Sequence, residues 1–310
     1  MSLDPNYLQY PMRRHGMDHE RYAWSMLTDR PPVQWPGGKT LALWVNVSLQ
    51  HFPLNPQGLP VKLPGAMSMP YPDLRHYTLR DYGNRVGVYR FLDAFDRLGI
   101  RASFAINACL VQQHRALVNE VVRRGDEILG HSWSMDTPHA GGLAEAQERE
   151  LIHRSLDALR QASGRAVRGW LGPGRLQSEN TPELLHEAGV LYFSDWVNDE
   201  LPYRFHTRYG DLWSVPLCNE LDDRFVIMDN QHSEASWAQQ VMDACDLLLA
   251  ESREQGGRLL SLSIHPWVLG QPHRIKHLEA ALAYVIAQPG VWCAQPGEIL
   301  ASFAAQQGPA

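Results

Sequence analysis

The sequence has few cysteines and no long apolar run. Its four cysteines lie far apart among 310 residues and form no Cys-x-x-Cys pair, which excludes a thiolate zinc finger and fits reduced thiols. No apolar stretch approaches the roughly 20 residues that span a bilayer, and the N-terminus lacks the apolar centre of a signal peptide. We therefore expect a cytoplasmic protein with no membrane partner.

Positive charge is also sparse. The chain carries 28 Lys and Arg residues against 34 Asp and Glu residues, a formal net charge of −6, and no basic run is longer than a pair. A surface that binds a polyanion needs concentrated cations. We therefore expect no nucleic-acid partner, and a small-molecule substrate instead.

What the sequence does contain is apolar material, since 44% of its residues are hydrophobic, which rules out a disordered or fibrous protein. Prolines gather in two stretches, residues 1–39 and 53–80. We interpret the first as an N-terminal arm laid over a surface or a neighbouring subunit, and the second as a loop long enough to be a lid or binding loop. The predicted organisation is an arm at 1–39 and one domain at 40–305.

From Thr40 onward, short β-rich runs alternate with amphipathic helices. This alternation predicts an α/β fold whose parallel sheet closes into a distorted (β/α) barrel of about seven or eight units. One unit should be imperfect, because Asp211–Asp229 has two strand-like pieces without a helix between them. The predicted strands are Leu41–Val47, Ala102–Asn107, Glu127–Gly130, Val167–Leu171, Leu191–Ser194, Trp213–Leu217, Leu259–Ile264 and Val291–Ala294.

Polar side chains follow the ends of these strands. The C-terminal ends of parallel strands share one face, where barrel enzymes carry their chemistry. A plain structural alternative exists for each residue: a histidine can be satisfied within the core, an aspartate can cap a turn, and an arginine or glutamate can be solvated. The residues at these ends are Asn46, His51, Asn107, His131, Arg175, Asp195, Asn219, Glu220 and His265.

Five segments in chain order carry a family resemblance. They are Asp81–Val88, Gly125–His131, Gly169–Arg175 with Ser178–Thr181, Asp195–Trp196 with Asp199–Tyr203, and Ile264–Pro266 with Val268, Gly270, Gln271 and Pro272. Over about residues 40–300 the chain resembles the polysaccharide deacetylase superfamily, and within it the branch of deacetylase-like allantoinases and cyclic imide hydrolases. The resemblance implies a distorted barrel and hydrolysis of a non-peptide C–N bond.

The resemblance also implies a metal site, whose expected ligands can be compared with the residues at the matching positions. Sugar-deacetylating members hold a divalent metal, usually zinc, with one Asp of the first motif and two His spaced four residues apart in the second. Here the first strand ends without a carboxylate, and Met135 stands four residues after His131. Zinc normally takes three protein ligands and a water. We expect no cofactor, while a rearranged zinc site from His131, His139, Glu220 or His265 stays open.

The resulting hypothesis is hydrolysis of a small cyclic imide or ureide, whose leaving nitrogen is stabilised by a second carbonyl. One of His131 and His265 acts as general base and the other as general acid, while Asp195 orients an imidazole. Arg175 binds the second carbonyl or the oxyanion. The other expected substrate-binding residues are Trp170, Glu220, Trp133, Asn46 and Arg85.

Two other functions stay open. One is a metal-dependent deacetylase of N-acetylated sugars or peptidoglycan fragments, and the other is a non-catalytic barrel that binds a small ligand. Because the two proline-rich segments exceed what one barrel mouth needs, and because the resemblance implies oligomeric relatives, we also expect a homo-oligomer.

Overall fold

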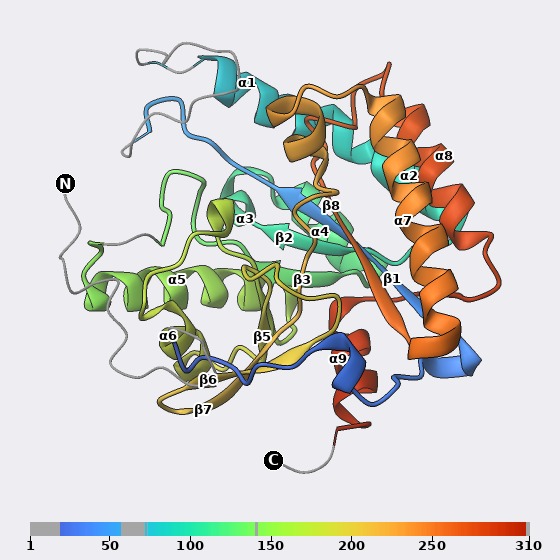
Figure 1. Cartoon of the computed structure of the whole chain (residues 1–310). Coiled ribbons are helices and arrows are strands. Elements are labelled where there is room, and N and C mark those ends of the chain that lie inside the picture. The colour runs from blue at the N-terminus through green and yellow to red at the C-terminus, as the bar shows by residue number, and fades with distance from the viewer. Residues whose placement is uncertain (1–18, 57–71, 73, 140–141, 308–310) are drawn as a thin grey trace.

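The structure, a computed structural model, describes residues 19–56, 72, 74–139 and 142–307. Nine strands within these residues form one curled sheet in the order β6-β7-β5-β4-β3-β2-β1-β8, with β9 also paired to β1 (Figure 1). All paired strands are parallel except β6 and β7. The predicted α/β fold with a distorted barrel is confirmed. The strands are β1 Leu41–Leu49, β2 Ser103–Ile106, β3 Glu127–Gly130, β4 Gly169–Trp170, β5 Tyr192–Phe193, β6 Tyr203–Thr207, β7 Gly210–Ser214, β8 Arg258–Ile264 and β9 Val291–Cys293.

Helices cover the outside of the sheet, and α7 and α8 lie side by side along one flank (Figure 1). The helix α2 buries Phe91, Leu92 and Phe95 on one face. It is capped by Gly99, whose φ of 66° favours glycine. None of the helices in the described ranges is long and apolar enough to cross a membrane. The helices are α1 Leu74–Tyr82, α2 Val88–Leu98, α3 Leu110–Gln113, α4 Arg115–Arg124, α5 Glu145–Ser163, α6 Thr181–Glu187, α7 Glu234–Gln255, α8 Ile275–Ile286 and α9 Pro296–Ala304, with π-helical segments at Gly83–Gly87 and Arg224–Asp229.

Two sequence expectations about loops need correction. The stretch 53–80, predicted to be a loop, runs into α1 from Leu74 onward, and its residues 57–71 and 73 lie outside the described part. In the imperfect unit, β7 ends at Ser214, and the second apolar piece forms the π-helical segment Arg224–Asp229 instead of a strand. A short apolar run has no periodicity that separates a strand from a helical turn.

The barrel is completed without a strand ladder between β7 and β8. The chain that follows β7 lies beside β8, where Ser261 Oγ donates to the Pro216 carbonyl at 3.1 Å and accepts from the Cys218 amide N–H at 2.9 Å. A side-chain hydroxyl therefore replaces the missing backbone ladder. This arrangement brings the segment after β7, including residues 219–224, to the same end of the barrel as the end of β8.

Side chains fill the part of the barrel interior that lies away from the C-terminal ends of the strands. Trp44, Leu129 and Tyr192 belong to a buried apolar cluster separate from the larger core between sheet and helices. Trp44 Nε1 donates to Ser103 Oγ at 2.7 Å, and that hydroxyl donates to Asn46 Oδ1 at 2.9 Å. Because this layer is packed, the barrel interior leaves room for a ligand toward the C-terminal ends of the strands.

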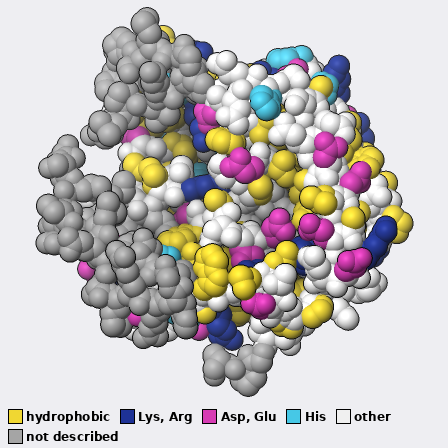
Figure 2. Space-filling view, in the orientation of Figure 1, with side chains coloured by type: hydrophobic (Ala, Val, Ile, Leu, Met, Phe, Trp, Pro, Cys, Tyr) yellow, Lys and Arg dark blue, Asp and Glu magenta, His cyan; other side chains and the backbone are white. Residues whose placement is uncertain are grey.

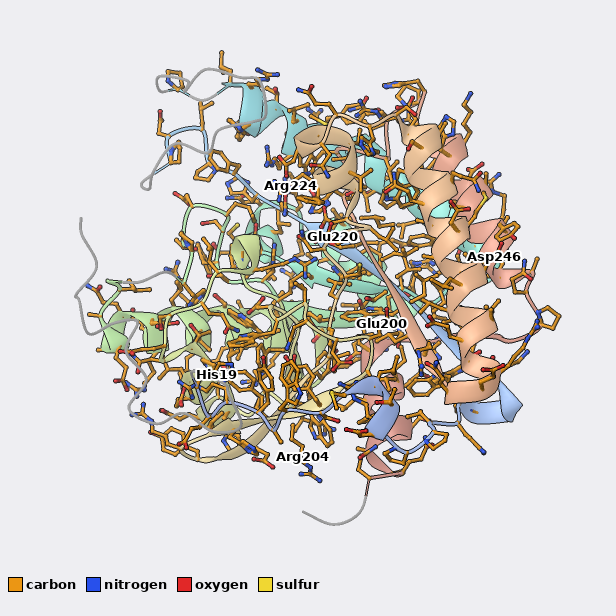
Figure 3. All side chains as sticks on the ribbon, in the orientation of Figure 1. His19, Glu200, Arg204, Glu220, Arg224 and Asp246 are labelled. Carbon is orange, nitrogen blue, oxygen red and sulfur yellow. The ribbon has the colours of Figure 1, made fainter. Side chains whose placement is uncertain are left out.

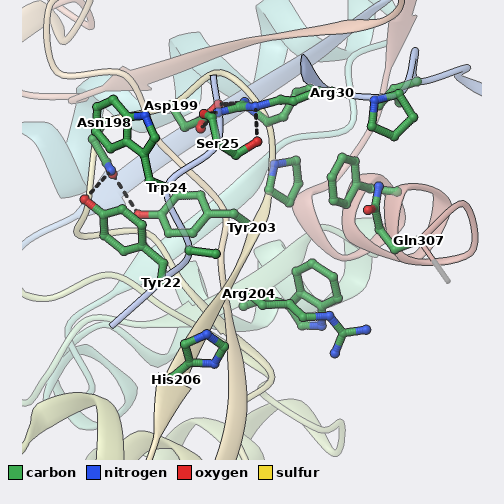
Figure 4. A pocket seen from close by; sticks show the side chains of 17 residues that line it. Tyr22, Trp24, Ser25, Arg30, Asn198, Asp199, Tyr203, Arg204, His206 and Gln307 are labelled. Atoms are coloured by element: carbon green, nitrogen blue, oxygen red, sulfur yellow. Dashed lines mark hydrogen bonds and ion pairs between the residues drawn. The ribbon is translucent and has the colours of Figure 1, made fainter. Parts of the chain in front are cut away.

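The described part of the N-terminal arm lies on the chain's own surface. The His206 amide in β6 donates to the Arg21 carbonyl at 2.6 Å, and Arg21 also pairs with Glu183 of α6. A cavity of about 390 Å³ lies between this arm, β6 and α9 (Figure 4). Inside it Arg30 meets both carboxylate oxygens of Asp199 at 2.7 Å. The Arg30–Asp199 ion pair thus attaches the arm to the barrel.

Candidate active site

A cavity of about 460 Å³ opens at the C-terminal ends of the strands. That volume is in the range of small-molecule sites. Charged groups of both signs line it: the guanidinium groups of Arg80, Arg175 and Arg224, and the carboxylates of Asp136 and Asp222. Acidic and basic side chains are likewise interspersed over the face seen in Figure 2, with no gathered basic patch on it. His131 and His265 both line this cavity, as the strand-end argument predicts.

His265 follows β8 directly and is paired with a buried carboxylate. Its Nδ1 lies 2.6 Å from Asp223 Oδ1, and its backbone N–H donates to Asp223 Oδ2 at 2.9 Å. Since an ionised carboxylate can only accept, Nδ1 carries the proton and Nε2 carries the lone pair. Burial raises the pKa of Asp223, and the hydrogen bonds from His265 oppose that rise. The pair has the geometry of an acid–base dyad.

His131 follows β3 and meets a neutral partner. Its Nδ1 lies 2.5 Å from the Leu171 carbonyl oxygen, which can only accept, so Nδ1 is the protonated nitrogen here too. Its Nε2 is buried and has no hydrogen-bond partner among the described residues. Burial is the largest influence on this imidazole and lowers its pKa to about 4. At neutral pH, His131 therefore presents an uncharged acceptor atom.

Close glycine contacts position the loop that carries His265. A Cβ on Gly83 would lie 2.7 Å from the Trp267 nitrogen, and one on Gly87 would lie 2.1 Å from the Pro266 oxygen. The glycines of the Asp81–Val88 segment thus let this π-helical segment pack against the residues just after His265. On the preceding helix α1, the Arg80 guanidinium stacks 4.3 Å from the Trp267 ring and lines the cavity.

Arg175 lines the cavity from a strained position. Its φ is 56°, in the left-handed region. Its guanidinium donates to the Leu217 carbonyl at 2.8 Å and to the Ser194 carbonyl at 3.3 Å. Burial lowers its pKa, and nearby Asp222 opposes that shift. The structure therefore places this charge next to the cavity, as the sequence predicts.

Asp195 does not hold an imidazole, and this sequence expectation is corrected. Its carboxylate accepts from the Gly172 amide at 2.6 Å and from Gln177 Nε2 at 2.7 Å. The orienting carboxylate of His265 is Asp223. No local pattern indicates Asp223, because it lies 42 residues away from its partner along the chain.

Five other expected binding residues are absent from the residues that line this cavity. Trp170 is fully buried in the outer core, and Trp133 stacks under the Arg154 guanidinium at 3.6 Å. Asn46 lies in the packed layer bound to Ser103. Arg85 pairs with Asp81 on the surface, and Glu220 is exposed in the loop that carries Arg224 (Figure 3).

These residues were expected to bind substrate because they lie close to strand ends in the sequence, and that criterion was not sufficient. Successive residues of a strand point to opposite faces, so Trp170 points away from the interior that its neighbour Leu171 enters. The lining residues that sequence reasoning missed include Arg80, Ser48, Gln50 and Ser263. The signal available for the last three was the period-two alternation within β1 and β8, which places them on the same face as His265.

The residues present do not fit the metal that the family implies. Among the described residues, Asp222, Asp223 and His265 bring potential ligand atoms within 4.8 Å of one another. Both oxygens of Asp223 accept from His265, however, and Asp222 Oδ1 accepts from the Arg224 and Phe225 amides. His139, the other candidate ligand, has Nδ1 on Glu148 and Nε2 on Ser132. Most ligand atoms of this cluster and of His139 are thus committed to hydrogen bonds. Within the described part of the chain, the Nε2 atoms of His131 and His265 are not, but two nitrogens fall short of the three protein ligands that zinc normally takes.

The curled β/α barrel places an aspartate–histidine pair beside a cavity at its strand ends. The family profile described as Polysaccharide deacetylase matches residues 77–193. The structure of PuuE allantoinase superposes with a TM-score of 0.80 at 26% identity, covering 91% of this chain and 96% of that one.

Two further relatives are also described as polysaccharide deacetylases. A probable polysaccharide deacetylase from Pseudomonas aeruginosa PAO1 gives a TM-score of 0.78 at 25% identity, covering 90% of this chain and 95% of that one. A Schizosaccharomyces pombe protein, provisionally named a polysaccharide deacetylase, is 24% identical over 81% of this chain and 84% of its own length. The chain is thus similar to polysaccharide deacetylases in sequence over residues 77–193 and in fold over about nine-tenths of its length.

Proposed function

We propose that the protein opens the ring of a small cyclic ureide or imide by adding water across an amide-type C–N bond. The observation that carries this proposal is the pair of imidazoles in one small cavity, of which only His265 is paired with a carboxylate. The similarity to an allantoinase structure supports the same class of substrate.

In this proposal, His265 is the general base and then the general acid. Its unprotonated Nε2 takes a proton from a water molecule, and the water oxygen bonds to the ring carbonyl carbon. The C–N bond then breaks, and the imidazolium returns the proton to the leaving nitrogen. One water is consumed and a carboxylic acid is formed, which releases its proton to solvent at neutral pH. Asp223 stabilises the imidazolium between these steps and keeps Nε2 directed at the substrate.

His131 has a different task because its pKa of about 4 leaves it neutral at physiological pH. A neutral imidazole with a protonated Nδ1 offers Nε2 as an acceptor. We assign it to hold the attacking water or a ring N–H by that atom. It does not serve as the acid, since too small a fraction carries a proton at neutral pH.

The charge of the cavity supports addition to a carbonyl. Its guanidinium groups outnumber its lining carboxylates, so negative charge developing on a carbonyl oxygen is stabilised. A cyclic ureide or imide places a second carbonyl on the leaving nitrogen, which delocalises the charge left on it. Such a bond breaks with less assistance than a simple acetamide.

The test is mass spectrometry of products after incubation with hydantoins, cyclic imides, allantoin and N-acetylated sugars. The protein is first treated with a chelator and then divided, with zinc added back to one half. The proposal expects a product heavier than its parent by one water, without acetate release, equally in both halves. Acetate release that depends on added zinc would instead support the metal-dependent deacetylase.

A matched variant links any turnover to the dyad. In His265→Asn, the side-chain amide nitrogen can occupy the place of Nδ1 and donate to Asp223 while Nε2 is deleted. His273→Asn is the control, because His273 is exposed on the surface. Ring opening that survives in folded His265→Asn contradicts the assigned role, and ligand binding without turnover in the wild type would indicate a binding protein.

A further inference from the structure

The Asp195 carboxylate binds both ends of a segment that forms one wall of the cavity. The residues Gly172 to Leu176 all line the cavity. Asp195, just after β5, accepts from the Gly172 amide N–H at 2.6 Å and from Gln177 Nε2 at 2.7 Å. Its two oxygens therefore fix both ends of the segment 172–177.

Both partners of Asp195 present hydrogen-bond donors. The Gly172 amide can only donate. The Gln177 side chain is oriented because its Oε1 accepts from Trp196 Nε1 at 3.0 Å, which turns its NH₂ group toward Asp195. An ionised carboxylate accepts strongly at both oxygens in this arrangement. A protonated Asp195 offers a weaker acceptor at its hydroxyl oxygen, and an asparagine in its place directs an N–H at one of these donors.

The segment needs such a partner because its backbone is strained. Arg175 has a φ of 56°, and non-glycine residues rarely adopt this region. The segment also turns tightly: a Cβ on Gly172 would lie 2.8 Å from the Leu176 oxygen and 3.3 Å from Asp195 Oδ2. A strained segment relaxes when the contacts that hold it are lost.

We propose that Asp195 is a positioning residue whose ionised carboxylate holds segment 172–177, and with it Arg175, in the conformation that binds substrate. The inference rests on the proposed function, because it takes this cavity as the substrate site. Among the described residues, no hydrogen bond joins Asp195 to an imidazole, so it acts through the segment and not on the reacting atoms.

The same contact makes substrate binding sensitive to acid. Burial raises the pKa of Asp195 to about 6, and the opposing influences are its two hydrogen bonds, the Arg175 guanidinium and the His139 imidazole. On its other side, Arg21 and Glu179 line the same surface hollow. Asp195 therefore gains a proton as the pH falls through about 6, and the segment is released below that pH.

Hydrogen exchange of the full-length protein without substrate tests the held segment directly. In Asp195→Asn at pH 7.5, we expect amides of the peptide spanning 172–177 to exchange roughly tenfold faster, as for the loss of about one hydrogen bond. In the wild type, a similar increase should appear between pH 7 and pH 5, after correction for intrinsic exchange. The variant should lose this pH dependence.

Two further variants complete the exchange experiment. Asp126→Asn is the control, since its buried carboxylate also accepts from a backbone amide and an arginine, at the opposite end of β3 from His131. Gln177→Leu removes one donor and should give a smaller increase. Unchanged exchange in folded Asp195→Asn and Gln177→Leu overturns the proposal.

Steady-state kinetics supply the second readout. We expect Asp195→Asn to raise KM by about tenfold while kcat changes less than about threefold, because the reacting groups are untouched. A loss confined to kcat overturns the positioning role. If the wild type turns over none of the test compounds, the proposed function fails, while the exchange experiment still decides whether Asp195 holds the segment.

Discussion

His131 and His265 occupy matching places in the barrel and differ in what lies behind the ring. Each directly follows a strand and lines the same cavity. The Nδ1 of His265 meets the Asp223 carboxylate, whereas that of His131 meets the Leu171 carbonyl. A carboxylate stabilises an imidazolium, while a carbonyl only fixes the neutral tautomer. The hydrogen-bond partner of Nδ1, more than position in the fold, therefore decides which histidine can transfer a proton.

The largest expected effect comes from deleting Nε2 of His265. In His265→Asn, kcat should fall by about a thousandfold, because one residue supplies both proton transfers. Steady-state turnover of the ring-opened substrate measures this change, with the exposed His273→Asn as control. A loss below tenfold would mean that the two histidines share the proton transfers.

A second expectation concerns acid stability and His131. Its pKa is about 4 in the folded protein and near 6.5 in the unfolded chain, so the unfolded state binds the proton more readily between these values. The free energy of unfolding should therefore fall by about 3 kcal/mol as the pH drops from 6.5 to 4 on account of this group. Urea unfolding of wild type and His131→Asn across this range should show the decline reduced in the variant.

The contribution of Asp195 to the free energy of unfolding changes with pH in the opposite direction over the same range. Its folded pKa of about 6 lies above the ordinary value of 3.8, so the unfolding free energy it contributes falls as the pH rises from 3.8 through 6. The two buried groups partly offset each other in the wild type. His131→Asn and Asp195→Asn should accordingly shift the pH dependence of stability in opposite directions, and shifts of the same sign would contradict this account.

Removing the carboxylate behind His265 should have an intermediate effect on rate. In Asp223→Asn, the imidazolium loses its charged partner, and kcat should fall by about a hundredfold. Kinetics at several pH values, with the exposed Asp243→Asn as control, measure it. An unchanged rate would indicate that Asp223 only supports the loop through the backbone N–H of His265.

The smallest effect on rate is expected at His131. In His131→Asn, the amide can still donate to Leu171 while Nε2 is lost, so only one hydrogen bond to water or substrate disappears. Activity at neutral pH should fall by about tenfold. A fall as large as that of His265→Asn would show that the contrast between the two rings is not functional.

The sequence predicted the parts of the molecule that depend on local pattern. The strand at β3 and most of β1 and β8 follow from apolar runs, and both histidines follow from standing directly after them. The strand β6 was missed, because Tyr203–Thr207 carries Arg204 and His206 on an exposed edge and so lacks an apolar run. Long-range partners such as Asp223 leave no trace in local spacing, since only the closed barrel brings residues 223 and 265 together.

The end of the sheet at β6 gives the N-terminal arm a further role. β6 pairs with β7 on one side, and part of its other side is covered where the His206 amide meets the Arg21 carbonyl. Uncovered edge strands favour association with the edges of other molecules. Proteolytic loss of residues 19–24 would therefore expose this edge and favour aggregation during expression and storage.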